Sequence, residues 1–149
     1  MSGNGSKLVQ EVNKSTEAVI GAAIEVHKHL GPGLLESAYE ECLCHELSLR
    51  NISFKRQVPL PVIYKGTKLD CGYRIDLLVN DEVIVELKSV DGISPIHEAQ
   101  ALTYMRLGNW KVGLILNFSL PYKRTKSNRQ VRQSRQENLE NLAYLASWR

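Results

Sequence analysis

The stretch of sequence that decides the fold covers residues 72–89 and reads GYRIDLLVNDEVIVELKS. On each side of its central Asn-Asp-Glu run, apolar residues alternate with other residues. The two apolar sets are Ile75, Leu77 and Val79, and then Val83, Val85 and Leu87. Alternation with a period of two predicts two β-strands, each with one apolar face and one face that carries charge.

The two strands are expected to form a hairpin whose register follows from their apolar faces. Pairing Val79 with Val83 puts both apolar sets on the same face and leaves residues 80–82 as a three-residue loop. A two-residue loop would put the sets on opposite faces. The sequence therefore predicts the longer turn, together with a bulge.

The same register places Asp76 directly opposite Glu86, and Arg74 opposite Lys88. Side chains in such pairs lie roughly 5 Å apart at Cβ, and like charges there are destabilising. A divalent cation would explain the two acids, because Mg²⁺ takes hard oxygen ligands such as carboxylates. The alternative is an ordinary exposed charged face on which Lys88 neutralises Glu86. These strands alone leave both interpretations open.

The length and composition predict one soluble domain. A chain of 149 residues can bury about two-thirds of its unfolded surface, and 43% apolar with 23% charged residues is typical of globular proteins. No apolar run approaches the roughly 20 residues of a membrane span, and the polar start has no signal-peptide core. Cys42, Cys44 and Cys71 are an odd count without CxxC spacing, so reduced thiols and a cytoplasmic location are expected.

Charge is distributed unevenly along the chain, whose net charge is +3. Residues 1–98 contain 14 acidic and 10 basic residues, whereas residues 99–149 contain 2 acidic and 9 basic ones. The basic cluster over residues 123–135 consists of Lys123, Arg124, Lys126, Arg129, Arg132 and Arg135. Such a tail can contact a phosphate backbone. The alternative is a solvated tail without a partner.

Apolar residues at helical spacing predict four helices, over residues 8–30, 34–50, 95–107 and 136–148. The Gly-Pro-Gly run at residues 31–33 ends the first helix, because Gly is favoured just past a helix end and Pro beyond it. Ser94 followed by Pro95 is typical of a cap and a first helical position.

Two further strands are predicted, over residues 54–64 and 111–117. Pro59 and Pro61 in the first favour an edge strand, because proline cannot donate to a ladder. The second is expected to run parallel to its neighbour, since a helix connects them. The order ααβββαβ predicts an α/β sandwich with a small mixed sheet over residues 1–121, followed by the basic tail over residues 122–149.

The helix over residues 95–107 carries a polar pair, Gln100 and Tyr104. Spacing of i, i+3, i+4 and i+7 aligns one face, which contains His97, Gln100, Ala101 and Tyr104. The other side, expected to pack on the sheet, contains Ile96, Ala99, Leu102 and Met105. The polar pair would then lie near the carboxylates. The alternative is a tyrosine of the core or its rim.

Together these residues resemble the motifs of the PD-(D/E)XK nuclease superfamily. Asp76 matches the acid of its first strand motif, residues 86–88 (Glu-Leu-Lys) match its (D/E)XK, and Gln100-x-x-x-Tyr104 matches the helix motif of its RecB-like exonuclease branch. Within the superfamily the chain is most similar to the GxxExxY family, whose motif is Gly33-Leu34-Leu35-Glu36-Ser37-Ala38-Tyr39. The resemblance covers residues 8–121. Ile75 stands where the superfamily pattern has Pro, a departure that removes no ligand.

The resemblance implies a restriction-endonuclease-like fold and a metal site. Asp76, Glu86 and the main-chain carbonyl of Leu87 would hold Mg²⁺, with Mn²⁺ as a substitute. Lys88 would orient or help deprotonate the attacking water, or stabilise the transition state. 

Three helical residues have implied supporting roles. Glu36 would support the metal or the water, and the alternative is an acid at a helix start with no catalytic use. Gln100 and Tyr104 would contact substrate phosphate or hold the active-site lysine.

Two hypotheses for function follow. The first is a Mg²⁺-dependent nuclease that hydrolyses phosphodiester bonds, with DNA as the expected substrate. The second is a non-catalytic module on the same fold that binds nucleic acid or a protein partner, because fold does not fix function. The complete set of acids and lysine favours the nuclease. Expected partners are DNA, with the basic tail as a phosphate contact, and a second copy in a homodimer, but no membrane.

Overall fold

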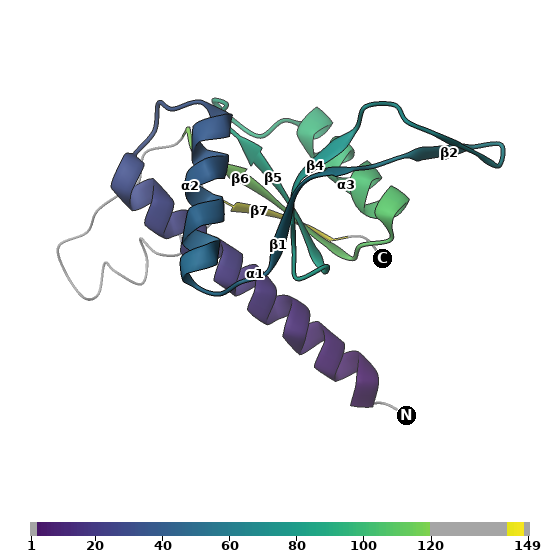
Figure 1. Ribbon diagram of the computed structural model, residues 1–149, viewed down its shortest axis with the longest axis horizontal. Coiled ribbons are helices and arrows are strands. Elements are labelled where there is room, and N and C mark those ends of the chain that lie inside the picture. Colours follow the sequence, from purple (N-terminus) through teal and green to yellow (C-terminus); the bar gives the residue numbers. More distant parts are fainter. Residues whose placement is uncertain (1–2, 120–142, 148–149) are drawn as a thin grey trace.

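A five-stranded mixed sheet with helices on both faces forms the body of the molecule (Figure 1). The computed structural model describes residues 3–119 and 143–147. The helices are α1 (Gly3–Leu30), α2 (Glu36–Leu49) and α3 (Pro95–Gly108). The strands are β1 (Phe54–Pro59), β2 (Val62–Tyr64), β3 (Thr67–Leu69), β4 (Arg74–Val79), β5 (Val83–Lys88), β6 (Val112–Asn117) and β7 (Ala143–Ser147). The sheet order is β1-β4-β5-β6-β7, and β2 pairs with β3 separately.

Two apolar clusters hold the layers together. On one face, α1 and α2 pack against the sheet through a cluster that includes Leu43 and Leu87. On the other face, Met105 of α3 packs against Ile84. Gly113 of β6 permits this approach, because a Cβ there would lie 2.9 Å from the Met105 sulfur. The predicted α/β sandwich with a small mixed sheet is confirmed. No helix of the described residues is long and apolar enough to cross a membrane.

The β4–β5 hairpin has the predicted register. Val79 pairs with Val83, and the N–H of Glu82 donates to the carbonyl of Val79 at 3.0 Å. Asn80 and Asp81 have φ angles of 52° and 54°. Asn and Asp tolerate this left-handed conformation better than most residues do, so the loop sequence suits the turn.

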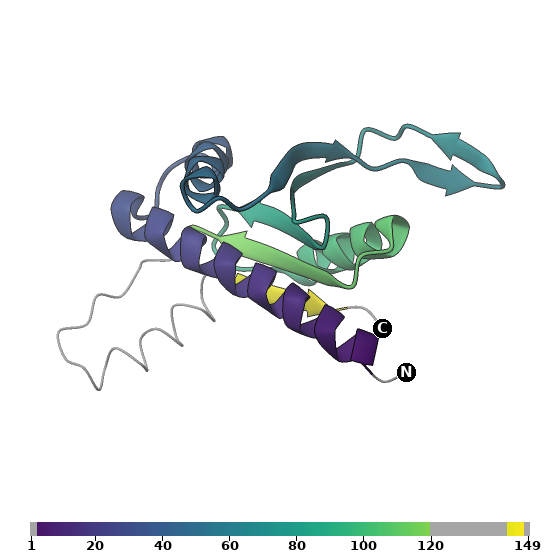
Figure 2. The ribbon, with the colours of Figure 1, turned by 60° about the horizontal axis from the view of Figure 1, so that its bottom comes forward.

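The predicted strand over residues 54–64 is divided in the structure. β1 ends at Pro59 and β2 begins at Val62, because neither Pro59 nor Pro61 has an amide hydrogen for a ladder. β1 lies at the edge of the sheet, as predicted. β3 was not predicted; it pairs with β2 in a hairpin that extends away from the body of the molecule (Figure 2).

The predicted terminal helix is wrong over residues 143–147, which form β7. This strand pairs antiparallel with β6, from Val112↔Ser147 to Leu116↔Ala143. The pairing gives partners to the N–H and C=O groups along that edge of β6, a gain that a separate helix would not provide. β6 runs parallel to β5 after α3, as predicted. The basic cluster and the boundary expected after residue 121 lie outside the described residues.

The buried side of α3 differs from the prediction. Ile96 and Leu102, expected to pack on the sheet, are 72% and 38% exposed, whereas Ala101, Tyr104 and Met105 are buried. Only Met105 was assigned correctly among the sheet-facing residues. The rotation of the helix brings Tyr104 from the expected polar face into the core, next to the sheet.

Candidate active site

The candidate site lies where β4 and β5 part. Regular pairing ends at Leu77↔Val85, so the predicted direct pairing of Asp76 with Glu86 does not form. Instead the N–H of Leu87 donates to Asp76 Oδ2 at 2.8 Å, and the N–H of Asp76 lies 3.4 Å from Glu86 Oε1. Like charges in a direct pair repel, and here each carboxylate takes an N–H of the opposite strand. The two acids therefore meet, but through this crossed arrangement.

Burial and mutual repulsion make these acids hard to ionise. Glu86 is 6% exposed. Burial, followed by the charge of Asp76, raises the pKa of Glu86 to about 8, while Lys88 opposes the rise. Burial also raises the pKa of Asp76, against the hydrogen bond from the N–H of Leu87. Keeping both carboxylates ionised costs free energy that a bound cation would offset.

Lys88 occupies the last position of β5. It pairs with Asn117 of β6 rather than facing Arg74, which pairs with Pro59 of β1. Its charge lowers the pKa of both Asp76 and Glu86, yet none of the ion pairs formed by the described residues includes it. The ammonium group therefore favours the ionised form of both acids, and no salt bridge among the described residues holds it.

The main chain of β5 supplies a further oxygen. The carbonyl of Lys88 faces β6, where it accepts from the N–H of Phe118 at 3.0 Å. Successive carbonyls of a strand point to opposite sides, so the carbonyl of Leu87 faces β4. This is the side on which the N–H of Leu87 meets Asp76.

α2 brings Glu36 to the end of β5. Glu36 Oε1 accepts from the N–H of Ser89 at 3.0 Å, although 53 residues separate the two. Glu36 is also the first residue of its helix, where the helix dipole favours a carboxylate. The structure thus brings Glu36 to the predicted site.

Tyr39 fixes the turn that precedes this helix. Its hydroxyl donates to the carbonyl of Gly31 at 2.5 Å and accepts from the N–H of Leu34 at 3.2 Å. Its ring stacks on Phe118, with centroids 4.4 Å apart and planes inclined by 9°. Gly33, with φ of 105°, adopts a conformation that favours glycine. The turn is therefore tied to the residue that follows β6.

An open cavity of about 180 Å³ lies beside Asp76. Its lining residues are Glu36, Ser37, Glu40, Gln57, Asp76 and Leu87. That volume suits a hydrated ion or part of a phosphate group.

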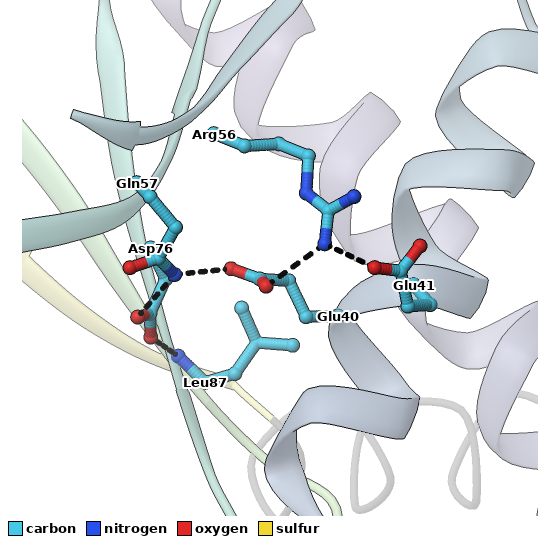
Figure 3. A network of polar contacts seen from close by, with 6 residues as sticks. All are labelled: Glu40, Glu41, Arg56, Gln57, Asp76 and Leu87. Atoms are coloured by element: carbon cyan, nitrogen blue, oxygen red, sulfur yellow. Dashed lines mark hydrogen bonds and ion pairs between the residues drawn. The ribbon is translucent and has the colours of Figure 1, made fainter.

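A polar network that the sequence did not predict lies on the α2 side of Asp76 (Figure 3). Gln57 Nε2 donates to Glu40 Oε1 at 2.7 Å and lies 3.4 Å from Asp76 Oδ1. Arg56 donates to Glu40 Oε2 at 3.0 Å and to Glu41 Oε1 at 2.7 Å. A single amide therefore connects a buried acid of α2 to the acid of β4.

Of the two central residues of this network, Glu40 could have been predicted from the sequence and Gln57 could not. Glu40 follows Glu36 by four positions, so the two share a helix face, and that spacing was a usable signal. Gln57 has φ of 48° within β1. No local sequence pattern predicts a glutamine with a left-handed backbone conformation in a strand.

Gln100 and Tyr104 lie on the α3 side of the sheet. Gln100 Nε2 donates to the Tyr104 hydroxyl at 2.8 Å, and Tyr104 is 4% exposed. Burial raises the pKa of Tyr104, and the charges of Glu86 and Asp76 act in the same direction. The charges of the two acids thus act on Tyr104, but neither Gln100 nor Tyr104 lines the cavity.

The oxygen donors of the site suit a hard cation. No group of three or more His, Cys, Asp or Glu side chains in the described part of the chain is placed to hold a metal ion. The donors at hand are the carboxylates of Asp76 and Glu86 and the carbonyl of Leu87. Mg²⁺ is commonly bound by one or two carboxylates together with waters, whereas structural zinc sites need four Cys or His ligands. The set fits Mg²⁺.

Comparison with known proteins identifies the family of the chain. The family model described as the PD-(D/E)XK nuclease superfamily matches residues 13–131, which is most of the chain. Searches of curated proteins and of solved structures found no match to this chain. The matched range contains every residue discussed above at the site.

Proposed function

The chain belongs to the PD-(D/E)XK nuclease superfamily, and from this premise we propose that it is a Mg²⁺-dependent nuclease that hydrolyses phosphodiester bonds in DNA. The observation that carries the proposal is the meeting of Asp76 and Glu86 where β4 and β5 part, with Lys88 two residues after Glu86 at the end of β5. Nucleases of this superfamily generally use divalent metal ions. In this chain Asp76, Glu86 and the carbonyl of Leu87 would hold the ion, with Mn²⁺ as a substitute.

When bound, Mg²⁺ would act as a Lewis acid. It would offset charge on the scissile phosphate and lower the pKa of a bound water. Lys88 orients the attacking water or stabilises the transition state, because its charge acts on both acids and none of the ion pairs formed by the described residues includes it. Glu36, on the cavity wall, positions that water. Lys88 reaches the site from β5 and Glu36 from α2.

Gln100 and Tyr104 have a supporting role in this proposal. A hydroxyl on a residue that is only 4% exposed is poorly placed to meet a substrate phosphate directly. Held by Gln100 at 2.8 Å, Tyr104 would instead position Glu86 and Lys88 from the α3 side.

We further propose that the chain belongs to the GxxExxY family within the superfamily. Each residue of that motif has a task in the structure: Gly33 turns the chain, Glu36 reaches the end of β5, and Tyr39 fixes the turn. The motif is thereby accounted for as a device that delivers a carboxylate to the site.

Cleavage assays test the proposed activity. Wild type, Lys88→Ala and a control, Lys55→Ala, would be incubated with linear and circular, single- and double-stranded DNA and RNA, in Mg²⁺, Mn²⁺ or EDTA. Lys55 forms an exposed ion pair with Asp81, so its loss should leave activity unchanged. We expect DNA cleavage that requires metal and falls about 100-fold or more in Lys88→Ala.

The contrary result is equally informative. If folded protein binds metal but cuts none of these substrates, the nuclease proposal is wrong. The non-catalytic module that binds nucleic acid or a protein would then be the better hypothesis.

A further inference from the structure

The β2–β3 hairpin exposes large apolar side chains on an arm that leaves the body of the molecule (Figures 1 and 2). Ile63, Tyr64 and Leu69 are 69%, 60% and 41% exposed. A two-stranded hairpin is marginally stable by itself. Side chains of this kind on a projecting hairpin point to a contact with another molecule.

The same arm carries cations that are not paired. Lys65 and Lys68 are exposed, and neither takes part in an ion pair formed by the described residues. Lys65 Nζ lies 5.4 Å from the centroid of the Tyr64 ring. The nearby acid, Asp70, accepts from the N–H of Gly72 at 2.9 Å and so serves the turn into β4. The tip of the arm therefore presents positive charge beside an aromatic ring.

The base of the arm is joined to the candidate site. The N–H of Leu60 donates to the carbonyl of Tyr73 at 2.9 Å, which closes the base between β1 and β4. The ring of Tyr73 lies 5.8 Å from that of Tyr104. From Leu60 to Lys65 the chain can extend about 17 Å, a distance that corresponds to roughly five nucleotides of one DNA strand.

We propose that the β2–β3 hairpin binds the DNA strand that flanks the scissile bond. Lys65 and Lys68 contact backbone phosphates, and Tyr64 packs on an unpaired base. The register places Lys68 opposite Ile63 on one face of the hairpin, while Val62, Tyr64 and Leu69 share the other face. The exposed charge of Lys68 and of Lys65, which lies in the turn beside Tyr64, favours a phosphate backbone as the partner. The inference rests on the proposed function, because it names the substrate contact of the same site.

Salt-dependent binding tests the phosphate contacts. Binding of fluorescein-labelled 30-nucleotide DNA, single- and double-stranded, would be measured by anisotropy in EDTA from 50 to 200 mM KCl. Each phosphate contact adds about 0.9 to the slope of log K against log salt on duplex DNA. We expect Lys65→Ala/Lys68→Ala to lower the slope by nearly 2 and affinity by roughly tenfold or more. The control Lys7→Ala/Lys14→Ala removes two exposed lysines of α1. It should lower the salt slope less than the variant of the arm does.

The aromatic contact has its own test. Tyr64→Ala should weaken binding of single-stranded DNA about 5- to 100-fold without changing the salt slope, because stacking involves no counterion release. Tyr64→Phe keeps the ring and should restore the affinity. Equal loss in both variants would overturn the stacking role of Tyr64.

The outcomes separate this inference from the proposed function. If Mg²⁺-dependent cleavage occurs but the double lysine variant has the slope of its control, the arm is not the DNA contact. If the variant loses its slope but no cleavage is found, the arm stands and the chemistry fails. If Ile63→Glu converts a dimer to a monomer in light scattering while DNA binding is unchanged, the arm binds a second copy and the inference is wrong.

Discussion

The carboxylates of Asp76 and Glu86 lose hydration on folding and come close to each other. Few hydrogen bonds in the structure offset the free-energy cost of keeping both of them ionised. One N–H donates to Asp76 at 2.8 Å, and the N–H that faces Glu86 is 3.4 Å away, a long distance for a hydrogen bond. Native proteins tolerate such costs mainly at functional sites. The strain on these two acids is the residue-level feature that best fits metal binding.

The cost should make stability depend on pH in metal-free protein. The pKa of Glu86 rises from 4.5 to about 8 on folding, so between these values the native state binds more protons than the unfolded state. The stabilisation is complete below about pH 4.5 and is lost as pH rises towards 8. We expect Glu86→Gln to raise the free energy of unfolding at pH 8 by about 1–3 kcal/mol.

Urea denaturation in EDTA at pH 5, 6.5 and 8 measures this effect. The control, Asp81→Asn, removes only an exposed ion pair with Lys55 and should change stability by less than about 1 kcal/mol. Identical pH profiles for wild type and Glu86→Gln would contradict the prediction.

Gln57 has a second local cost, in its backbone. Its φ of 48° is unfavourable for residues with a Cβ but not for glycine. Gln57→Gly and Gln57→Ala both remove the amide that bridges Glu40 and Asp76. We therefore expect the glycine variant to be more stable than the alanine variant by about 1 kcal/mol, measured by urea denaturation. Greater stability of the alanine variant would show that β1 relaxes to an ordinary strand conformation.

At the scale of elements, the site depends on one turn between two helices. The Tyr39 hydroxyl bonds to Gly31 and Leu34 on that turn, and the ring stacks on Phe118 after β6. The N-terminus of α2 is thereby held against the end of β5, where Glu36 meets Ser89.

Removing the hydroxyl should loosen this turn. Tyr39→Phe keeps the stacking but leaves the carbonyl of Gly31 without its donor, so we expect a loss of about 1–2 kcal/mol. In thermal unfolding of a chain of this size, that corresponds to roughly 2–8 °C. Tyr64→Phe, at a site 60% exposed, is the matched control. A Tyr39→Phe melting temperature equal to wild type would show that the turn is fixed by stacking alone.

At the scale of the whole molecule, the site joins both layers of helices through the sheet. α2 contributes Glu36 and Glu40 on one side, α3 contributes Tyr104 on the other, and the parted strands lie between them. A ligand that binds there stabilises the entire fold, since binding to the native state alone shifts the unfolding equilibrium.

Mg²⁺ should therefore raise the melting temperature. At a free Mg²⁺ concentration 100 times the dissociation constant, the expected stabilisation is about 2.7 kcal/mol. Asp76→Asn should abolish the shift, whereas Asp91→Asn, which changes an exposed acid, should retain it. A shift of equal size in the Asp76 variant would mean that the metal binds elsewhere.

Short-range patterns predicted much of this molecule. Alternation gave the register at Val79 and Val83, and helical spacing gave three helices. Local patterns do not determine the structure where the same spacing is compatible with a helix and with a strand. Residues 143–147 have helical spacing in sequence, yet they pair with β6, because partners for an open strand edge are a long-range requirement.

The sequence by itself determined the superfamily motifs, the hairpin and the parallel strand after α3, because period-two and helical spacing are local properties of the chain. Only the tertiary structure decided that β4 and β5 part at Asp76, and that Gln57 connects it to Glu40. The projection of the β2–β3 hairpin from the body of the molecule was likewise evident only from the tertiary structure. These features arise from repulsion, burial and hydrogen bonding between residues distant in sequence, which no local pattern records.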